Sequence, residues 1–152
     1  MTINAKYTHT NLVARDWQRL ARFYEAVFGC LPILPERDLS GKWLEEATGL
    51  AGAHLRGIHL RLPGLGDHGP TLEIFEYDQE AEGLPPAANR PGFSHIAFAV
   101  DDVGGALAAV QSAGGGAIGS QVTLAVSGAG RVEIVYATDP EGNIIELQKW
   151  ST

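Results

Sequence analysis

The sequence predicts an α+β fold made of two βαβββ modules, because one pattern occurs twice along the chain. A β-rich segment that contains a histidine appears at residues 7–14 and again at residues 93–100, and an aspartate follows each histidine by seven positions. After each aspartate, apolar residues recur at helical spacing. Three further β-rich segments complete each copy. A pattern repeated in this way predicts two structurally equivalent halves.

The domain organisation follows from this repeat. A chain of 152 residues and 16.2 kDa has the size of one domain, so we assign residues 1–152 to a single domain. Within it, module one spans residues 5–78 and module two spans residues 92–150. The linker between them, residues 79–91, contains two consecutive prolines and shows little periodicity.

In module one, the first strand lies at residues 7–14 and the helix begins after Asp16. An aspartate in this position caps a helix by accepting hydrogen bonds from the free N–H groups of the first turn. Gly29 provides the C-terminal stop. The apolar stripe of this helix consists of Trp17, Leu20, Ala21, Tyr24, Val27 and Phe28. The three strands that follow lie at residues 31–35, 54–62 and 70–77.

In module two, the strand at residues 93–100 precedes a helix that begins after Asp102, which we expect to act as a cap like Asp16. Three glycines at residues 114–116 end this helix. The remaining strands lie at residues 117–126, 130–138 and 143–150, and the turn-forming residues 139–142 precede the last of them.

The two modules differ in length. His95 follows His9 by 86 residues, whereas Glu146 follows Glu73 by only 73. Module one therefore contains about 13 extra residues, and surface loops are where insertions are best tolerated. We place the extra residues in a loop at residues 36–53.

The composition disfavours several classes of partner. Acidic residues outnumber basic ones by 18 to 11, and the formal net charge of −7 disfavours binding to the phosphate backbone of a nucleic acid. No apolar run approaches the roughly 20 residues that cross a bilayer. The first residues lack the apolar segment of a signal peptide. Because the single cysteine, Cys30, cannot form an internal disulfide, we expect a cytoplasmic protein that binds neither membrane nor nucleic acid.

Strand alternation places two histidines and two glutamates at equivalent positions of the modules. His9 and His95 lie in the first strands, and Glu73 and Glu146 in the last strands point away from the apolar neighbours that pack on a helix. If the two sheets curve toward each other, the four side chains meet in one cavity. Two imidazoles and two carboxylates suit a divalent ion such as Ni²⁺, Zn²⁺, Co²⁺, Mn²⁺ or Fe²⁺.

Each of the four residues, taken singly, has an ordinary explanation. A lone strand histidine is more often a surface or hydrogen-bonded residue than a ligand, and a glutamate between apolar residues usually faces solvent. Filling four repeat-related positions with ligand types by chance is on the order of one in a thousand. Their joint occurrence therefore indicates a metal site.

Four motifs distributed from Tyr7 to Trp150 link the chain to a known family. They are His9 with Asp16, FYEAVFG at residues 23–29, GFSHIAFAVDDV at residues 92–103 and DPEGNIIEL at residues 139–147. With these motifs the chain resembles the vicinal oxygen chelate superfamily, which includes glyoxalases, bleomycin resistance proteins and extradiol dioxygenases. The resemblance implies a cup-shaped, eight-stranded mixed sheet around a metal site, helices on the outside, and a homodimer. It assigns the metal positions to His9, Glu73, His95 and Glu146.

The same resemblance implies a function. A shell of two histidines and two carboxylates is similar to that of glyoxalase I and close to that of methylmalonyl-CoA epimerase, which both remove a proton next to a carbonyl held on the metal. We therefore expect a metal-dependent lyase or isomerase of a small metabolite, with Glu146 or Glu73 as the general base. Two alternatives stay open: an Fe²⁺ extradiol dioxygenase, and a non-catalytic, small-molecule-binding resistance protein, although such proteins lack the metal ligands.

Five further residues are candidates for substrate binding. Asn11 shares a strand face with His9. His59 and Arg61 share a face of their strand, and they either enter the cavity and bind a substrate carboxylate or lie on a solvated edge. Phe75 and Trp150 are candidates for the wall of an apolar pocket.

Overall fold

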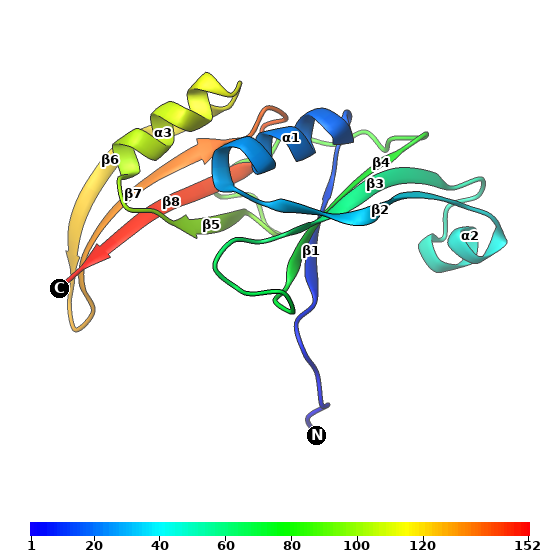
Figure 1. Cartoon of the computed structure of the whole chain (residues 1–152), viewed down its shortest axis with the longest axis horizontal. Helices are drawn as coiled ribbons and strands as arrows, with labels where there is room; N and C mark the ends of the chain where they lie inside the picture. Colours follow the sequence, from blue (N-terminus) through cyan, green and yellow to red (C-terminus); the bar gives the residue numbers. More distant parts are fainter. The chain divides into compact units, whose positions relative to one another are not determined.

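The computed structural model describes all residues from Met1 to Thr152 and divides into two compact units, Met1–Glu82 and Gly83–Thr152. Each unit contains one four-stranded mixed sheet, with α1 lying along the first sheet and α3 along the second (Figure 1). No helix or strand occurs between residues 78 and 94. None of the helices is long and apolar enough to cross a membrane.

The first unit contains four strands and two helices. In chain order these are β1 (His9–Val13), α1 (Trp17–Phe28), β2 (Leu31–Ser40), α2 (Lys42–Thr48), β3 (His54–Arg61) and β4 (Thr71–Tyr77). The strands are ordered β1-β4-β3-β2, with β1 parallel to β4 and the other neighbours antiparallel.

The second unit repeats this arrangement with one helix fewer. Its elements are β5 (His95–Ala99), α3 (Val103–Ser112), β6 (Gly116–Val126), β7 (Gly130–Thr138) and β8 (Ile144–Ser151). The strand order is β5-β8-β7-β6, again with the first and last strands parallel. The α+β class and the repeated module are thus confirmed, and the closure of the sheets into a cup stays a prediction.

The helix caps were predicted correctly in one module and only in part in the other. At the start of α1, Oδ1 of Asp16 accepts a hydrogen bond from the backbone N–H of Arg19 at 2.9 Å. Gly29 ends the helix in the left-handed conformation with φ 69°. Asp102 also occupies the N-cap position, of α3, but its side chain makes no capping hydrogen bond. Its carboxylate instead lies over Gly105, in space that a Cβ atom would fill.

The core of each unit lies between its helix and one face of its sheet. In the first unit, the buried face of α1 packs on the paired residues Ile58 and Ile74 and on Leu60 and Leu72. In the second unit, Val103 and Val110 of α3 are fully buried, as are four strand residues on the helix side. These four are Val135, Ala137, Ile145 and Leu147. The residues that alternate with them point to the opposite face of each sheet.

The loop expected at residues 36–53 is wrong, because these residues are largely structured. Strand β2 continues to Ser40, past a register shift between Ile33 and Arg37, and α2 follows. Leu44 of α2 is buried with Ala53 and Leu55, and Leu39, Phe75 and Tyr77 pack against this cluster. The helix is only seven residues long and buries a single side chain, so it has no apolar stripe from which to predict it.

The turn before β8 is held by a buried carboxylate. Asp139 is 2% exposed; its Oδ1 accepts from the backbone N–H groups of Glu141 and Asn143, and its Oδ2 accepts from the Asn143 side chain. Gly142 has φ 88°, which a residue with a Cβ atom rarely adopts. This turn fixes where β8 begins and therefore where Glu146 lies.

Candidate functional site

In the first unit, His9 and Glu73 lie on the same face of the sheet. In the parallel pair β1–β4, His9 is opposite Thr71 and Asn11 is opposite Glu73, so His9 is the diagonal neighbour of the glutamate. Nε2 of His9 is 3.7 Å from Oε1 of Glu73. Glu73 is 8% exposed overall, one of two buried charged residues in the chain. We call the side of the sheet that carries these residues the Glu73 face.

The carboxylate of Glu73 has one polar neighbour at each oxygen. Nδ2 of Asn11 donates to Oε1 at 2.8 Å, and Nε2 of His59 lies 2.7 Å from Oε2. His59 is opposite Glu73 in the antiparallel pair β3–β4. The amide donor and the nearby imidazole compensate a buried carboxylate for the loss of its hydration.

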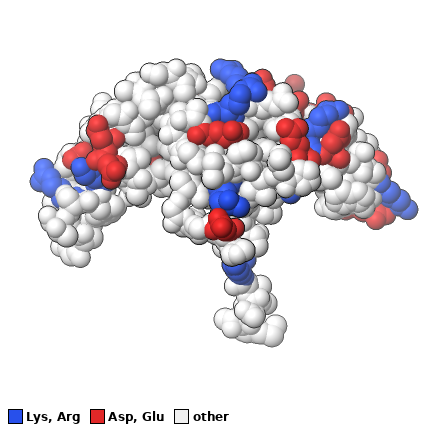
Figure 2. Space-filling model, viewed as in Figure 1, with Lys and Arg blue, Asp and Glu red and all other residues white.

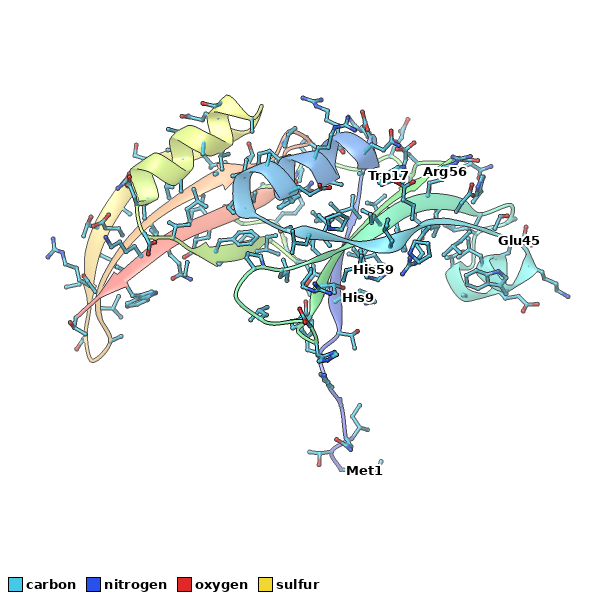
Figure 3. All side chains as sticks on the ribbon, viewed as in Figure 1. Met1, His9, Trp17, Glu45, Arg56 and His59 are labelled. Carbon is cyan, nitrogen blue, oxygen red and sulfur yellow. The ribbon has the colours of Figure 1, made fainter.

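His59 is surrounded by protein groups. Its ring meets the ring of His9 edge-on at a centroid distance of 5.7 Å and the ring of Phe75 at 6.0 Å. Figure 3 labels both histidines among the side chains of the first unit. Burial lowers the pKa of His59; the charge of Glu73 opposes this effect, and Arg37 and His9 add to it.

In the second unit, His95 and Glu146 repeat the same diagonal relationship. His95 is opposite Ile144 and Ala97 is opposite Glu146 in the parallel pair β5–β8. Nε2 of His95 is 3.0 Å from Oε2 of Glu146. Tyr136 is opposite Glu146 in the pair β7–β8, and its ring lies 5.2 Å from that of His95. The structure therefore brings together one imidazole and one carboxylate within each unit.

The donor chemistry of these residues fits a divalent metal. Imidazole nitrogen and carboxylate oxygen are the ligands of Zn²⁺, Ni²⁺, Co²⁺ and Fe²⁺ sites, and the His9 and His95 side chains are 43% and 33% exposed on open sheet faces. No group of three or more His, Cys, Asp or Glu side chains is arranged to hold a metal ion. The assembly of the four predicted ligands into one shell stays a prediction.

The five residues predicted to bind substrate have different surroundings. Asn11, His59 and Phe75 lie around Glu73 as described, and Arg61 lies on the same face, opposite Thr71. The Arg61 Nε is buried without a hydrogen-bond partner, and its Nη1 is 3.5 Å from Oδ1 of Asp67. Trp150 is in the other unit, half-exposed at the end of β8, where its Nε1 donates to Oε1 of Gln148 at 2.6 Å.

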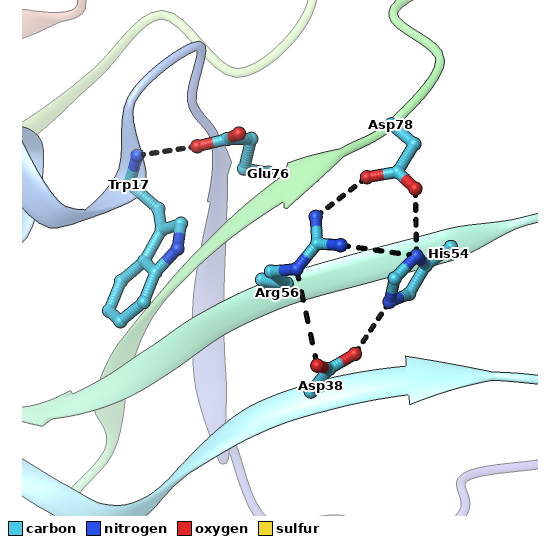
Figure 4. Close-up of polar contacts among 6 residues, drawn as sticks. All are labelled: Trp17, Asp38, His54, Arg56, Glu76 and Asp78. Carbon is cyan, nitrogen blue, oxygen red and sulfur yellow. Dashed lines mark hydrogen bonds and ion pairs between the residues drawn. The ribbon is translucent and has the colours of Figure 1, made fainter.

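A charged cluster that sequence reasoning missed lies on the opposite face of the first sheet. His54 contacts the carboxylates of Asp38 and Asp78 at 2.5 and 2.7 Å, and Arg56 donates to Asp78 at 2.7 Å (Figure 4). Contacts with Asp38 and then Asp78 raise the pKa of His54, and the pKa of Asp78 is lowered by Arg56 and then by His54. Asp38 is in β2, His54 and Arg56 are in β3 and Asp78 directly follows β4, so only the pairing of these strands reveals the cluster.

Next to this cluster is a pocket of about 670 Å³ at the N-terminal end of α1. Its lining includes Arg56, Glu76 and Trp17, whose backbone N–H donates to Oε2 of Glu76 at 3.1 Å. Glu76 is three residues from Glu73 on the same strand, so the pocket is on the helix side of the sheet. Acidic and basic side chains are interspersed on the visible surface, without an extended basic area (Figure 2).

Solved structures with the same fold are numerous. A glyoxalase family protein of Bacillus cereus is similar to this chain with a TM-score of 0.81 and 16% identity, covering 99% of this chain and 97% of its own. A glyoxalase family protein of Enterococcus faecalis is similar with a TM-score of 0.60 and 21% identity, and the match covers 94% of this chain and 96% of the other. The fosfomycin resistance protein FosX of Listeria monocytogenes is similar with a TM-score of 0.58 and 17% identity, and the match covers 99% of this chain and 94% of the other.

The sequence itself identifies the family. The model of the Glyoxalase/Bleomycin resistance protein/Dioxygenase superfamily matches residues 6–147, nearly the whole chain. The protein therefore belongs to this superfamily, as its motifs predicted. A search of curated proteins gave no significant match.

Proposed function

We propose that His9, Glu73, His95 and Glu146 bind one divalent metal ion and that the protein is a metal-dependent lyase or isomerase. The observation that carries the proposal is the identical diagonal His–Glu pair in both units. The repeated module thus places one imidazole and one carboxylate at equivalent positions of both sheets. The proposal extends to a small-molecule substrate and to a homodimer, the assembly that the family resemblance implies.

The chemistry that the metal supplies when bound is Lewis-acid polarisation of a substrate carbonyl, which acidifies the neighbouring C–H bond. Glu146 is suited to take that proton as general base, because its one ion pair within its unit is with His95. A carboxylate with few fixed partners is able to turn toward the substrate and back.

The substrate class follows from the Glu73 face. The Arg61 side chain is 35% exposed with its Nη1 3.5 Å from Asp67, and its guanidinium would pair with a substrate carboxylate or other anion. Phe75 offers an apolar surface beside His59. Both features support a small anionic carbonyl compound, such as a 2-oxo acid derivative or an acyl thioester.

The metal site is tested first. Metal-free protein is titrated with Co²⁺ or Ni²⁺, and we expect one ion per chain for the wild type and strongly reduced affinity for His9→Ala and His95→Ala. His68→Ala, at an exposed histidine of the first unit, is the matched control and should bind like the wild type. Equal affinity of wild type and His95→Ala would overturn the proposed shell.

The reaction is then tested by solvent-deuterium incorporation. Hemithioacetals and 2-substituted acyl thioesters are incubated in D₂O with metal-loaded protein, since exchange next to the carbonyl reports proton abstraction even when net conversion is slow. Oxygen consumption with catechols and Fe²⁺ would instead identify an extradiol dioxygenase. Tight binding of a small molecule without exchange or turnover would identify a non-catalytic binding protein.

A further inference from the structure

Glu73 is held at both of its carboxylate oxygens, which distinguishes it from Glu146. Asn11 donates to Oε1 at 2.8 Å, and Nε2 of His59 lies 2.7 Å from Oε2; the two residues come from the strands that flank β4. A carboxylate held from both sides keeps one orientation. It can still offer its remaining lone pairs to a ligand on the open face.

A third residue fixes His59 in turn. Nδ1 of His59 is 3.2 Å from the hydroxyl oxygen of Thr71, which is two residues before Glu73 on the same strand. An ionised carboxylate accepts hydrogen bonds and donates none, so the 2.7 Å contact with Glu73 favours the tautomer of His59 that has its proton on Nε2. Nδ1 is then free to accept from the Thr71 hydroxyl. We infer that in this tautomer Thr71, His59 and Glu73 form a directed chain of hydrogen bonds.

The second unit provides an internal comparison, because the same register positions are occupied there by other residues. Ala97 stands where Asn11 stands, Tyr136 where His59 stands, and Ile144 where Thr71 stands. Alanine and isoleucine side chains have no hydrogen-bonding group, and Tyr136 contacts the ring of His95. The backbone scaffold is therefore shared, while the hydrogen-bond chain belongs to the first unit alone.

We propose that His59, held by Thr71, is a positioning residue that presents Glu73 to the divalent metal in a fixed orientation. The proposal rests on the proposed function, because it takes Glu73 as a metal ligand. Partners of this kind orient metal ligands in many proteins, and removing one weakens metal affinity about 10–100-fold.

The first test compares two substitutions of His59 by Co²⁺ titration of metal-free protein. His59→Leu removes the donor, so Co²⁺ affinity should fall about 10–100-fold and the visible spectrum of the bound ion should change. His59→Gln keeps an N–H donor of similar reach and should restore affinity to within a few-fold of the wild type. His68→Gln is the control for loss of a histidine. Wild-type affinity and an unchanged Co²⁺ spectrum for His59→Leu would overturn the proposal.

The second test needs no metal and separates this proposal from the metal site itself. Nitrogen-15 NMR of metal-free protein should show His59 protonated at Nε2 and accepting at Nδ1, and Thr71→Val should perturb only the Nδ1 signal strongly. Protonation at Nδ1 in the wild type would contradict the hydrogen-bond chain. If the wild type binds no metal while the NMR result is as expected, the proposed function fails and His59 is a structural partner of Glu73 alone, which also overturns the positioning role.

Discussion

Asn11 lies directly opposite Glu73 in its sheet and donates a hydrogen bond to that carboxylate, whereas Ala97 lies directly opposite Glu146 and cannot donate one. The two glutamates therefore have the same place in the backbone and different freedom. One part of this difference is a single side-chain amide, which can be tested by exchanging the two residues.

Substituting Asn11 and Ala97 by each other's residue type should affect metal binding in one variant and turnover in the other. Asn11→Ala should weaken Co²⁺ binding about 10-fold, because Glu73 loses the donor at Oε1. Ala97→Asn adds an amide beside Glu146 and should slow turnover while metal affinity stays within a few-fold of the wild type. Titration and deuterium exchange measure the two effects. Unchanged metal affinity of Asn11→Ala would show that the amide does not support Glu73.

Replacing the general base should separate turnover from metal binding. Glu146→Gln keeps an amide oxygen for coordination but loses proton abstraction, so the rate at saturating metal should fall about 10²–10⁴-fold. Glu73→Gln should affect the rate less. It should weaken metal binding more, because its NH₂ group must face one of the two donors, Asn11 or His59. Exchange at the wild-type rate by Glu146→Gln would exclude Glu146 as the base.

The pH dependence of stability should include a contribution from His54. The pKa of His54 is raised by Asp38 and Asp78. Its contribution to the free energy of unfolding is therefore complete below its ordinary pKa of 6.5 and is lost as the pH rises through the raised value. The lowered pKa of Asp78 means that its contribution is lost only as the pH falls through that lower value. The difference in the free energy of unfolding between wild type and His54→Gln should thus be larger at about pH 5.5 than at about pH 8.5. His68→Gln is the control, and a difference that does not vary with pH would refute the prediction.

Helix α2 should be anchored by one side chain. Leu44 is 5% exposed in the cluster with Leu55, so Leu44→Ala should lower the free energy of unfolding by about 2–3 kcal/mol. The preceding residue, Trp43, is 56% exposed, and Trp43→Ala should change it by less than about 0.5 kcal/mol. Urea unfolding of both variants measures this contrast. Similar losses for the two variants would mean that α2 is held by another contact.

Most of the fold could be predicted from the sequence because one pattern occurs twice along the chain. Each strand has a period of two, and the apolar residues beside Glu73 and Glu146 are the ones that face a helix. The position of each predicted strand was therefore right, within a few residues at its ends, except for the extension of β2 to Ser40. Helix α2 was missed because its stability comes from one buried leucine and its tertiary contacts rather than from a periodic pattern.

The sequence predicts which site residues share a face of their strand, but it predicts less well which side chains contact one another. Alternation placed His9, Asn11, His59 and Arg61 on one side of a strand, but only strand register shows that His59 reaches Glu73 and Thr71. The same applies to His54, whose partners are Asp38 of β2 and Asp78, which directly follows β4. Register depends on contacts between segments distant in the sequence, and a single sequence does not display them.

The unequal holding of the two glutamates has a stereochemical consequence. If one carboxylate is fixed on the metal and only the other moves, the same oxygen atoms remove and return the proton, and both events occur on one face of the substrate carbon. Such an enzyme would shift a hydrogen between neighbouring atoms or exchange one of two enantiotopic hydrogens, without inverting the centre. Inversion would require a second mobile base on the other face, which the hydrogen-bond chain through His59 denies to Glu73.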